Sequence, residues 1–211
     1  GHASVINHVR MPGIGVSFSA GGAVIAGVVT ATSFSGDGSS LTGISGGVTS
    51  DAQGNTVGGS GAGDSFSGTN AENNTLFGKD AGTAITTADS TTAVGKDAGK
   101  SITTGSYNHL FGIAAGDAIT TGNNNTIMGH YAGSSFQTGS ENTIIGGNAG
   151  GGSSLGSYNV IVGKSCNQNN EGQKNVFIGQ GAIAYRSGTA SHNVIIGQAA
   201  AEFLTNGNHN A

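Results

Sequence analysis

The chain has 211 residues, of which 41 are glycine and 9% are charged, and its formal net charge is −4. This weakly acidic balance excludes a basic surface for nucleic acid and a cationic face for an anionic membrane. The longest apolar run, Ala23–Val29, is far shorter than the roughly 20 residues of a membrane span. We therefore expect neither nucleic-acid binding nor membrane insertion.

The single proline and the lone cysteine, Cys166, exclude further classes of protein. A collagen or polyproline stalk needs many prolines, an intrachain disulfide needs a second cysteine, and zinc motifs need Cys and His at set spacings. The sequence therefore predicts no disulfide, no metal and no cofactor.

Three regions follow one another along the chain. Residues 1–50 are expected to form an N-terminal β segment with a connector, in which Val24–Thr32 is a strand. Residues 51–73 are a Gly- and Ser-rich linker or a degenerate coil that begins at Asn55-Thr56-Val57. Residues 74–211 form a repeat domain, and because 204–210 repeat the pattern of 119–125, we expect it to continue in a longer fibrous protein.

The repeat domain is defined by a glycine that returns every 17 residues for five steps and then after 16 and 18 residues. The eight anchor glycines are Gly78, Gly95, Gly112, Gly129, Gly146, Gly163, Gly179 and Gly197. Repetition at a fixed period indicates a stack of similar units.

Each unit contains two apolar sites. Two apolar residues stand directly before each anchor, as in Leu76-Phe77, and such β-branched, Thr-flanked runs favour a short strand. A second apolar residue follows the anchor by seven positions and precedes Thr-Thr-Gly or a relative of it, which predicts a second short strand and a turn. This second column is Ile85, Ile102, Ile119, Phe136 and Leu204.

Two polar or small columns also recur. A small residue, usually alanine, follows each anchor by three positions, and Cys166 falls in this column as a small buried hydrophobe. An asparagine stands four positions before each anchor, with Thr91 as the exception, and is expected to form an amide ladder. This asparagine column is Asn74, Asn108, Asn125, Asn142, Asn159, Asn175 and Asn193.

These patterns predict an all-β fold, a β-solenoid of about eight 17-residue coils stacked about 4.8 Å apart. Neighbouring strand residues point to opposite faces, so if Leu76, Leu110 and Ile144 fill the coil, the next column points outward. An apolar stripe of several hundred Å² signals an interface, which predicts a homotrimer. The anchor glycines and the outward Phe77, Phe111, Ile145, Ile178 and Ile196 are then the structural core of the assembly.

The 17-residue units resemble repeats in tail-fibre-like structural proteins of tailed bacteriophages, especially marine cyanobacterial viruses. The segment 28–43, Val-Val-Thr-Ala-Thr-Ser-Phe-Ser-Gly-Asp-Gly-Ser-Ser-Leu-Thr-Gly, is similar to one common in the same proteins. A looser similarity links the repeats to the heads of trimeric autotransporter adhesins. Both resemblances imply homotrimers of left-handed β-rolls, and together they cover roughly residues 24–43 and 55–211.

Catalytic and metal chemistry find little support in the sequence. Asp80 and Asp97 share a column, but the other acidic residues are scattered, whereas glycosidic cleavage needs two convergent carboxylates. His192 and His209 are 17 residues apart and could stack, but no carboxylate or thiol joins them, so solvated turn histidines are the favoured interpretation. We expect no catalytic residue and no enzymatic activity.

An ice-binding solenoid is a more distant alternative. Threonines recur in two adjacent columns, which could form a flat face of hydroxyl and methyl groups. Adjacent columns point to opposite sides, however, and the array ends at Thr138. The columns are Thr86, Thr103 and Thr120, and Thr87, Thr104, Thr121 and Thr138.

The later coils lose the Ile-Thr-Thr-Gly segment and gain other polar groups, namely Asn169, Asn170, Tyr185 and Arg186. Function on repeat scaffolds is usually placed in variable turns, and an aromatic ring beside a guanidinium suits sugars. These four residues are the candidate binding site for a host-surface glycan, although drifted spacer coils are the simpler interpretation.

The resulting hypothesis is a structural segment of a viral tail or capsid fibre that spaces or presents a host-attachment surface. Its expected location is the virion, with other virion structural proteins as partners. The alternative is a bacterial trimeric surface adhesin or extracellular fibre on the cell surface.

Overall fold

The computed structural model describes residues 48–67, 70–151, 155–167, 172–182, 189–200 and 208. The chain divides into two units, Gly1–Thr42 and Gly43–Ala211, and every described residue belongs to the second. The expected strand Val24–Thr32 therefore lies outside the described residues.

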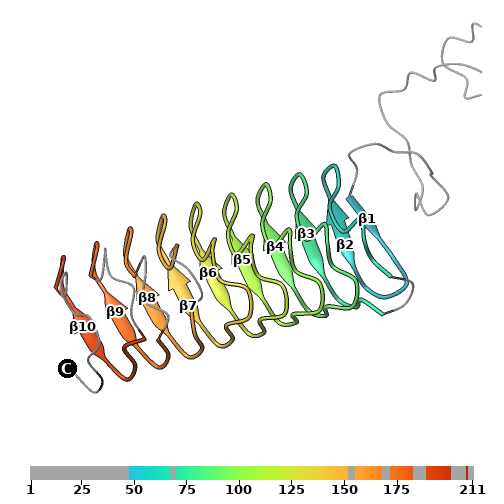
Figure 1. Ribbon diagram of the computed structural model, residues 1–211. Coiled ribbons are helices and arrows are strands. Elements are labelled where there is room, and N and C mark those ends of the chain that lie inside the picture. The colour runs from blue at the N-terminus through green and yellow to red at the C-terminus, as the bar shows by residue number, and fades with distance from the viewer. Residues whose placement is uncertain are drawn as a thin grey trace, which may run out of the picture. The chain divides into compact units, whose positions relative to one another are not determined.

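The described secondary structure consists of short β-strands joined in one sheet (Figure 1). The strands follow chain order across this sheet, so each coil contributes one strand beside its predecessor. Their bounds are β1 (Val48–Ser50), β2 (Thr56–Gly58), β3 (Thr75–Phe77), β4 (Thr92–Val94), β5 (His109–Phe111), β6 (Thr126–Met128), β7 (Thr143–Ile145), β8 (Val160–Val162), β9 (Val176–Ile178) and β10 (Val194–Ile196). The prediction of an all-β solenoid is confirmed.

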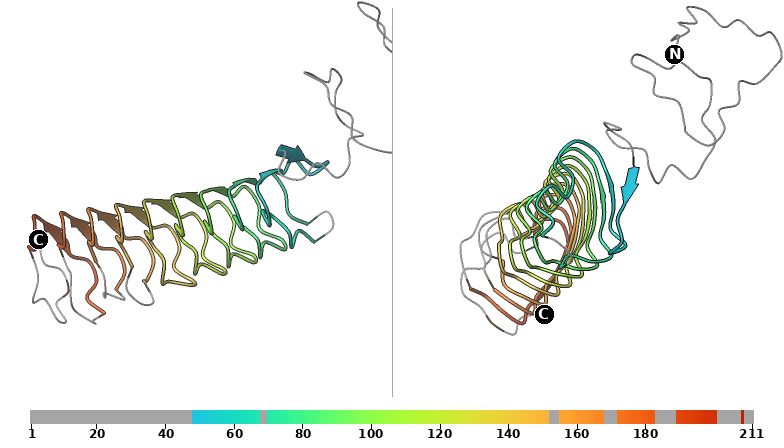
Figure 2. Two further views of the ribbon diagram at one scale, coloured as in Figure 1. Left: turned by 90° about the horizontal axis from the view of Figure 1, so that it is seen from above. Right: turned by 90° about the vertical axis from the view of Figure 1, so that its right-hand side faces the viewer.

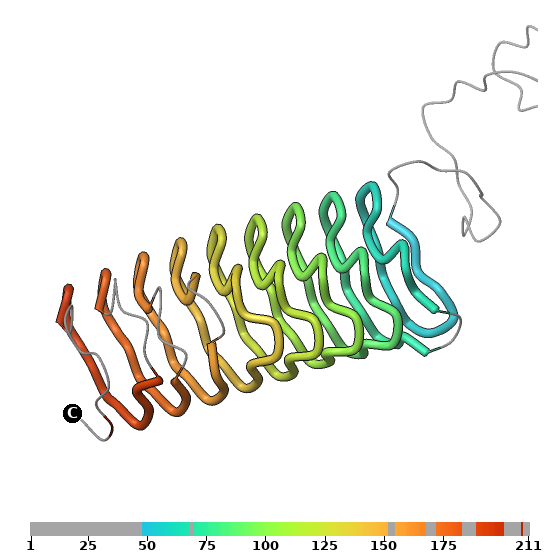
Figure 3. The backbone as a smooth tube through the Cα atoms, in the orientation of Figure 1, coloured from blue at the N-terminus to red at the C-terminus, as the bar shows by residue number. Residues whose placement is uncertain are grey.

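From β2 onward, neighbouring strands pair in parallel with residues of equivalent repeat position opposite each other. Thr75 pairs with Thr92, and Ile127 of β6 pairs with Ile144 of β7. β2 pairs with β3 in the same way, with Val57 opposite Leu76, so the stack includes a coil before Asn74. Figure 3 shows that successive coils follow closely similar paths.

β1 pairs antiparallel with β2 and covers the N-terminal edge of the parallel stack. The turn between them is held by Asp51, whose Oδ1 accepts hydrogen bonds from the backbone N–H groups of Gln53 at 3.0 Å and Asn55 at 2.8 Å. A paired edge is protected from adding an unrelated strand.

One apolar column fills the interior of the coils. The middle residue of each strand from β3 to β10 is buried, and the first and third residues point outward. The column of small residues is buried beside it from Ala81 to Ala182, including Cys166. The second apolar column is also interior, with Ile85, Ile102, Ile119 and Phe136 fully buried; Leu204 lies outside the described residues.

The second strand predicted at this apolar column is wrong. In the described residues each coil contributes one strand, because the second apolar residue hydrogen bonds within its own coil. The Ile85 N–H donates to the Gly82 carbonyl at 3.1 Å, and Thr86 and Thr87 both donate to the Thr103 carbonyl. A segment that turns back on itself cannot maintain the alternating hydrogen bonds of a strand.

The anchor glycines adopt a backbone conformation that favours glycine. From Gly78 to Gly197 their φ angles lie between 133° and 139°, a region that residues with a side chain rarely adopt. Each anchor N–H also donates to the preceding coil, as from Gly146 to the Met128 carbonyl at 2.8 Å.

The asparagine ladder is confirmed. The side-chain oxygen of Asn108 accepts hydrogen bonds from the backbone N–H of Asn125 at 3.1 Å and from its Nδ2 at 3.0 Å. The same Nδ2 donates to the Gly139 carbonyl at 3.0 Å in the following turn. Because the amides are fully buried, each coil satisfies polar groups of its neighbours that would otherwise be costly to bury.

Thr91 interrupts this ladder and is the basis of a first prediction. Its Oγ1 is buried without a hydrogen-bond partner, and the Gly105 carbonyl, which an asparagine at this position would reach, instead accepts from Asn108 Nδ2 at 3.1 Å. Thr91→Asn should restore the missing bonds and stabilise the fold by about 1 kcal/mol, or about 2–4 °C in melting temperature for a chain of this size.

Thermal unfolding followed by circular dichroism measures this gain. The matched control is Thr92→Asn, because Thr92 points outward at the neighbouring position and an amide there would have no ladder to join. Equal effects of the two substitutions would contradict the prediction.

Candidate interaction surface

The strands lie along one side of the stack (Figure 2), and the outer face of their sheet carries a continuous apolar column. The third residue of each strand from β3 to β10 forms this column, and these side chains are partly or largely exposed in the single chain. They are Phe77, Val94, Phe111, Met128, Ile145, Val162, Ile178 and Ile196, which we call the outer column. Aligned exposed apolar residues of this number indicate an interaction surface.

The outer column contains the five apolar residues expected to form the core of an assembly. In the single chain they are not interior: Phe77 and Ile178 are half-buried, Phe111 is 38% exposed, Ile145 is 37% exposed and Ile196 is 65% exposed. The interior of the chain is filled by their strand neighbours, as the alternation of strand side chains requires.

A second outward column lies beside the first, at the first residue of each strand. It is polar in the first coils and apolar in the last, and its members are Thr75, Thr92, His109, Thr126, Thr143, Val160, Val176 and Val194. None of the described strands contains Asp, Glu, Lys or Arg. An uncharged, flat and partly apolar face suits another protein surface better than a charged ligand.

The charged residues of the stack lie in its turns. Lys79 pairs with Asp80 at 2.6 Å, and Lys96 pairs with Asp97 in the next coil. These pairs join sequence neighbours through largely exposed lysine side chains, and ion pairs of exposed groups contribute little to stability. The shared column of Asp80 and Asp97 is therefore explained without a catalytic role.

Asp117 is the partly buried acidic residue of these turns. Its Oδ1 has no hydrogen-bond partner, and its Oδ2 lies 3.7 Å from Lys100 Nζ. Burial raises the pKa of the Asp117 carboxyl above its ordinary value, and the Lys100 charge offsets part of this effect. The folded chain thus binds this proton more tightly than the unfolded chain does.

The raised pKa of Asp117 gives the second prediction. Its contribution to stability is present below the ordinary aspartate pKa, about 3.9, and is lost as the pH rises through the folded-state pKa. Asp117→Asn should therefore raise the melting temperature at neutral pH, with a smaller gain in acid. The exposed Asp64→Asn is the control, and melting curves that show the same gain at both pH values would contradict the prediction.

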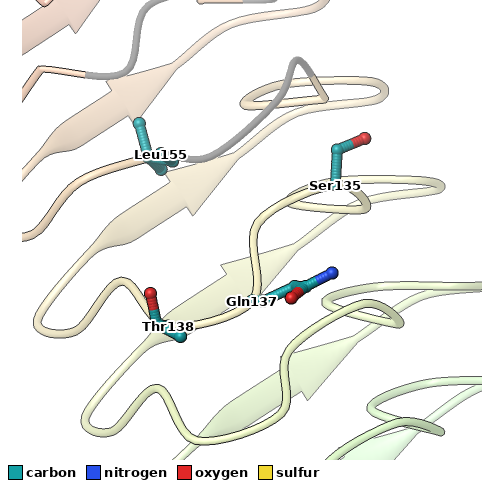
Figure 4. Close-up of a pocket in the computed structure, with 4 residues that line it drawn as sticks. All are labelled: Ser135, Gln137, Thr138 and Leu155. Carbon is teal, nitrogen blue, oxygen red and sulfur yellow. The ribbon is translucent and has the colours of Figure 1, made fainter.

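A shallow pocket of about 180 Å³ opens between two coils (Figure 4). Ser135, Gln137 and Thr138 come from one coil and Leu155 from the next. Leu155 is buried nine residues after its anchor Gly146, rather than seven, so this coil departs from the regular pattern. The pocket is smaller than the roughly 300–1,000 Å³ of typical ligand sites, and none of the described residues that line it is titratable.

The threonine columns differ in their exposure. The hydroxyls of Thr86, Thr103 and Thr120 each donate to a carbonyl of the next coil at 3.1–3.2 Å. The neighbouring column from Thr87 to Thr138 is exposed. A single free threonine column is narrower than the two-column face that the ice-binding alternative needs.

The candidate glycan-binding residues Asn169, Asn170, Tyr185 and Arg186 lie outside the described residues, as does His209. His192 lies in an exposed turn before β10. Within the described ranges, no three His, Cys, Asp or Glu side chains are grouped so that they could hold a metal ion. Nor do those ranges include a helix long and apolar enough to span a bilayer.

No family model, curated protein or solved structure matches the chain. Its function must therefore be argued from the stack and its outer face.

Proposed function

We propose that this chain is a non-enzymatic structural segment of a viral tail or capsid fibre, which spaces or presents a host-attachment surface. The observation that carries the proposal is the uncharged face of the sheet, with an apolar outer column that continues from Phe77 to Ile196. This face belongs to a stack in which the other side chains mainly bind one coil to the next.

The stack has the mechanical properties of a spacer. Nine parallel strands, β2 to β10, rise about 40 Å at 4.8 Å per strand. Backbone hydrogen bonds and the asparagine ladder both run between coils, so the axis is bonded along its whole length. Contacts between neighbouring repeats alone allow such a rod to be long.

The outer face supports assembly with further copies of the chain. Cyclic symmetry brings the same face of every copy to one axis, which would cover the outer column, and three copies give a fibre with no exposed apolar side. The virion is the proposed location, other virion structural proteins are the proposed neighbours, and Asn169, Asn170, Tyr185 and Arg186 are the proposed contacts to a host glycan.

Light scattering during size-exclusion chromatography tests this proposal. We expect the mass of three chains and a hydrodynamic radius larger than that of a globule of the same mass. A soluble, folded monomer at all accessible concentrations would overturn the trimeric fibre, because the outer column would then be stable in water.

A bacterial trimeric surface adhesin would use the same stack and the same face. The neighbouring reading frames distinguish the two functions: tail-tube and baseplate genes would support the viral fibre, and a membrane-anchor domain in the same frame would support the adhesin.

A further inference from the structure

The two halves of the outer face differ in composition. In β3 to β7 the first outward residue of each strand is threonine or histidine and the third is apolar. In β8, β9 and β10 both outward residues are aliphatic: Val160 and Val162, Val176 and Ile178, and Val194 and Ile196. Each C-terminal strand therefore presents about twice the number of apolar side chains.

The greater number of outward aliphatic side chains in β8 to β10 is not matched by a greater exposure of each one, since Val94, Phe111, Met128 and Ile145 of the N-terminal half are 37–48% exposed. Val194 is 43% exposed and Ile196 is 65% exposed, and the four aliphatic residues of β8 and β9 are half-buried. Apolar area removed from water is the main favourable term in protein association. Because each of β8, β9 and β10 presents two outward aliphatic side chains instead of one, we infer that these strands have the larger driving force per strand for burial against a partner.

We propose that copies of this chain associate first and most strongly through β8 to β10, with the rest of the outer face closing afterwards. This inference rests on the proposed homotrimer, and the partner is a second copy of the same segment. An uncharged face can meet itself without electrostatic repulsion, and the strands β2 to β10 present the same in-order sheet in every copy.

Because the outer face is small, the difference in apolar side chains between its two halves has a large effect on association. Nine strands of three residues cover about 40 Å by 10 Å, or on the order of 400 Å². A stable interface buries about 800 Å² on each partner. Because the whole face is modest in area, association depends on the strands that contribute most.

The same difference in composition sets the direction of pairing. With two copies parallel and in register, Val194 and Val176 meet aliphatic side chains and Thr75 meets Thr75. With two copies antiparallel, the valines would meet Thr75, Thr92 and His109, and polar groups would lose water without a matching partner. The composition of the face therefore favours copies that point the same way.

Disulfide trapping tests the direction of pairing. Two variants carry a single new cysteine, Thr75→Cys or Val194→Cys, in a Cys166→Ala background, since alanine is the usual residue of that buried column. Under mild oxidation each variant alone should form crosslinked pairs, with Val194→Cys crosslinking faster, and a mixture should give no mixed product. Crosslinking confined to the mixture would overturn this inference while leaving assembly intact, whereas no crosslinking together with a monomeric mass would reject the proposed function as well.

Two triple variants test where association is strongest. Val160→Thr, Val176→Thr and Val194→Thr each exchange one outward methyl group for a hydroxyl in the C-terminal half, and Thr75→Ser, Thr92→Ser and Thr126→Ser each delete one outward methyl group in the N-terminal half. Analytical ultracentrifugation should show association weakened at least tenfold by the first triple and less than threefold by the second. If the two triple variants weakened association equally while circular dichroism showed both to be folded, the proposal would be overturned.

Discussion

Replacing Gly146 with alanine should prevent the solenoid from stacking regularly, whereas the same change at the adjacent Gly147 should be tolerated. A Cβ on Gly146 would lie 2.6 Å from the carbonyl oxygen of Gly163 and 2.7 Å from its carbon. These are backbone atoms of the next coil, which cannot move without breaking the ladder. The φ angle of 133° at Gly146 adds backbone strain.

Strain and overpacking together should cost about 3–5 kcal/mol, a large part of the 5–15 kcal/mol by which a typical domain is stable. Gly147 is the matched control, because a Cβ there meets nothing closer than the His130 carbonyl oxygen at 4.0 Å. Thermal and denaturant unfolding of the two variants measure the difference. A Gly146→Ala variant as stable as Gly147→Ala would show that the coils can separate enough to admit a methyl group.

Ile144→Asp should be the second severe substitution. Ile144 is completely buried in the interior column, between Ile127 and Ile161 of the adjacent strands. A carboxylate there would be charged and unpaired, or would have to be protonated at a large cost in free energy. We therefore expect the free energy of unfolding to fall by about 4 kcal/mol or more. The variant should be unfolded or aggregated at every protein concentration.

Ile145→Asp is the informative comparison, because Ile145 is the next residue along the same strand and points outward. The single chain should fold, but the charge would lie in the proposed interface and should shift the mass in light scattering toward the monomer. If the proposed assembly is essential for folding, this variant too would lose its circular dichroism signal. A fully folded and fully associated Ile145→Asp would show that the outer column is not an interface.

The sequence predicted the parts of the fold that every coil repeats. The anchor glycines, the asparagines and the inner apolar residues each contact the equivalent residue of the next coil, so the stack imposes the same requirement at every period. Thr91 was visible as the exception, and the structure adds its unpartnered hydroxyl. The two apolar columns of adjacent residues, such as Ile144 and Ile145, were enough to predict one inner and one outer face.

The features that the sequence did not predict depend on backbone hydrogen bonds or occur in one coil only. The apolar column that includes Ile85 was expected to form a strand, but a recurring apolar residue can belong to a turn as well, and the Ile85 N–H bond to the Gly82 carbonyl decides between them. The pairing of β1 with β2 and the burial of Leu155 each occur once, so no repeated sequence pattern indicates them. The desolvation of the Asp117 carboxyl also follows from a single turn.

The in-register pairing of successive strands has a consequence for how such a rod changes length. Because each coil bonds to the next through the same groups, removing one full period joins two coils whose ladders still match. Coils of another length are also accepted where the columns stay aligned, because the 16-residue step before β9 and the 18-residue step before β10 keep equivalent residues paired. Gene rearrangements can therefore change the length of the rod in whole coils of about 4.8 Å, and the fold is preserved at each length.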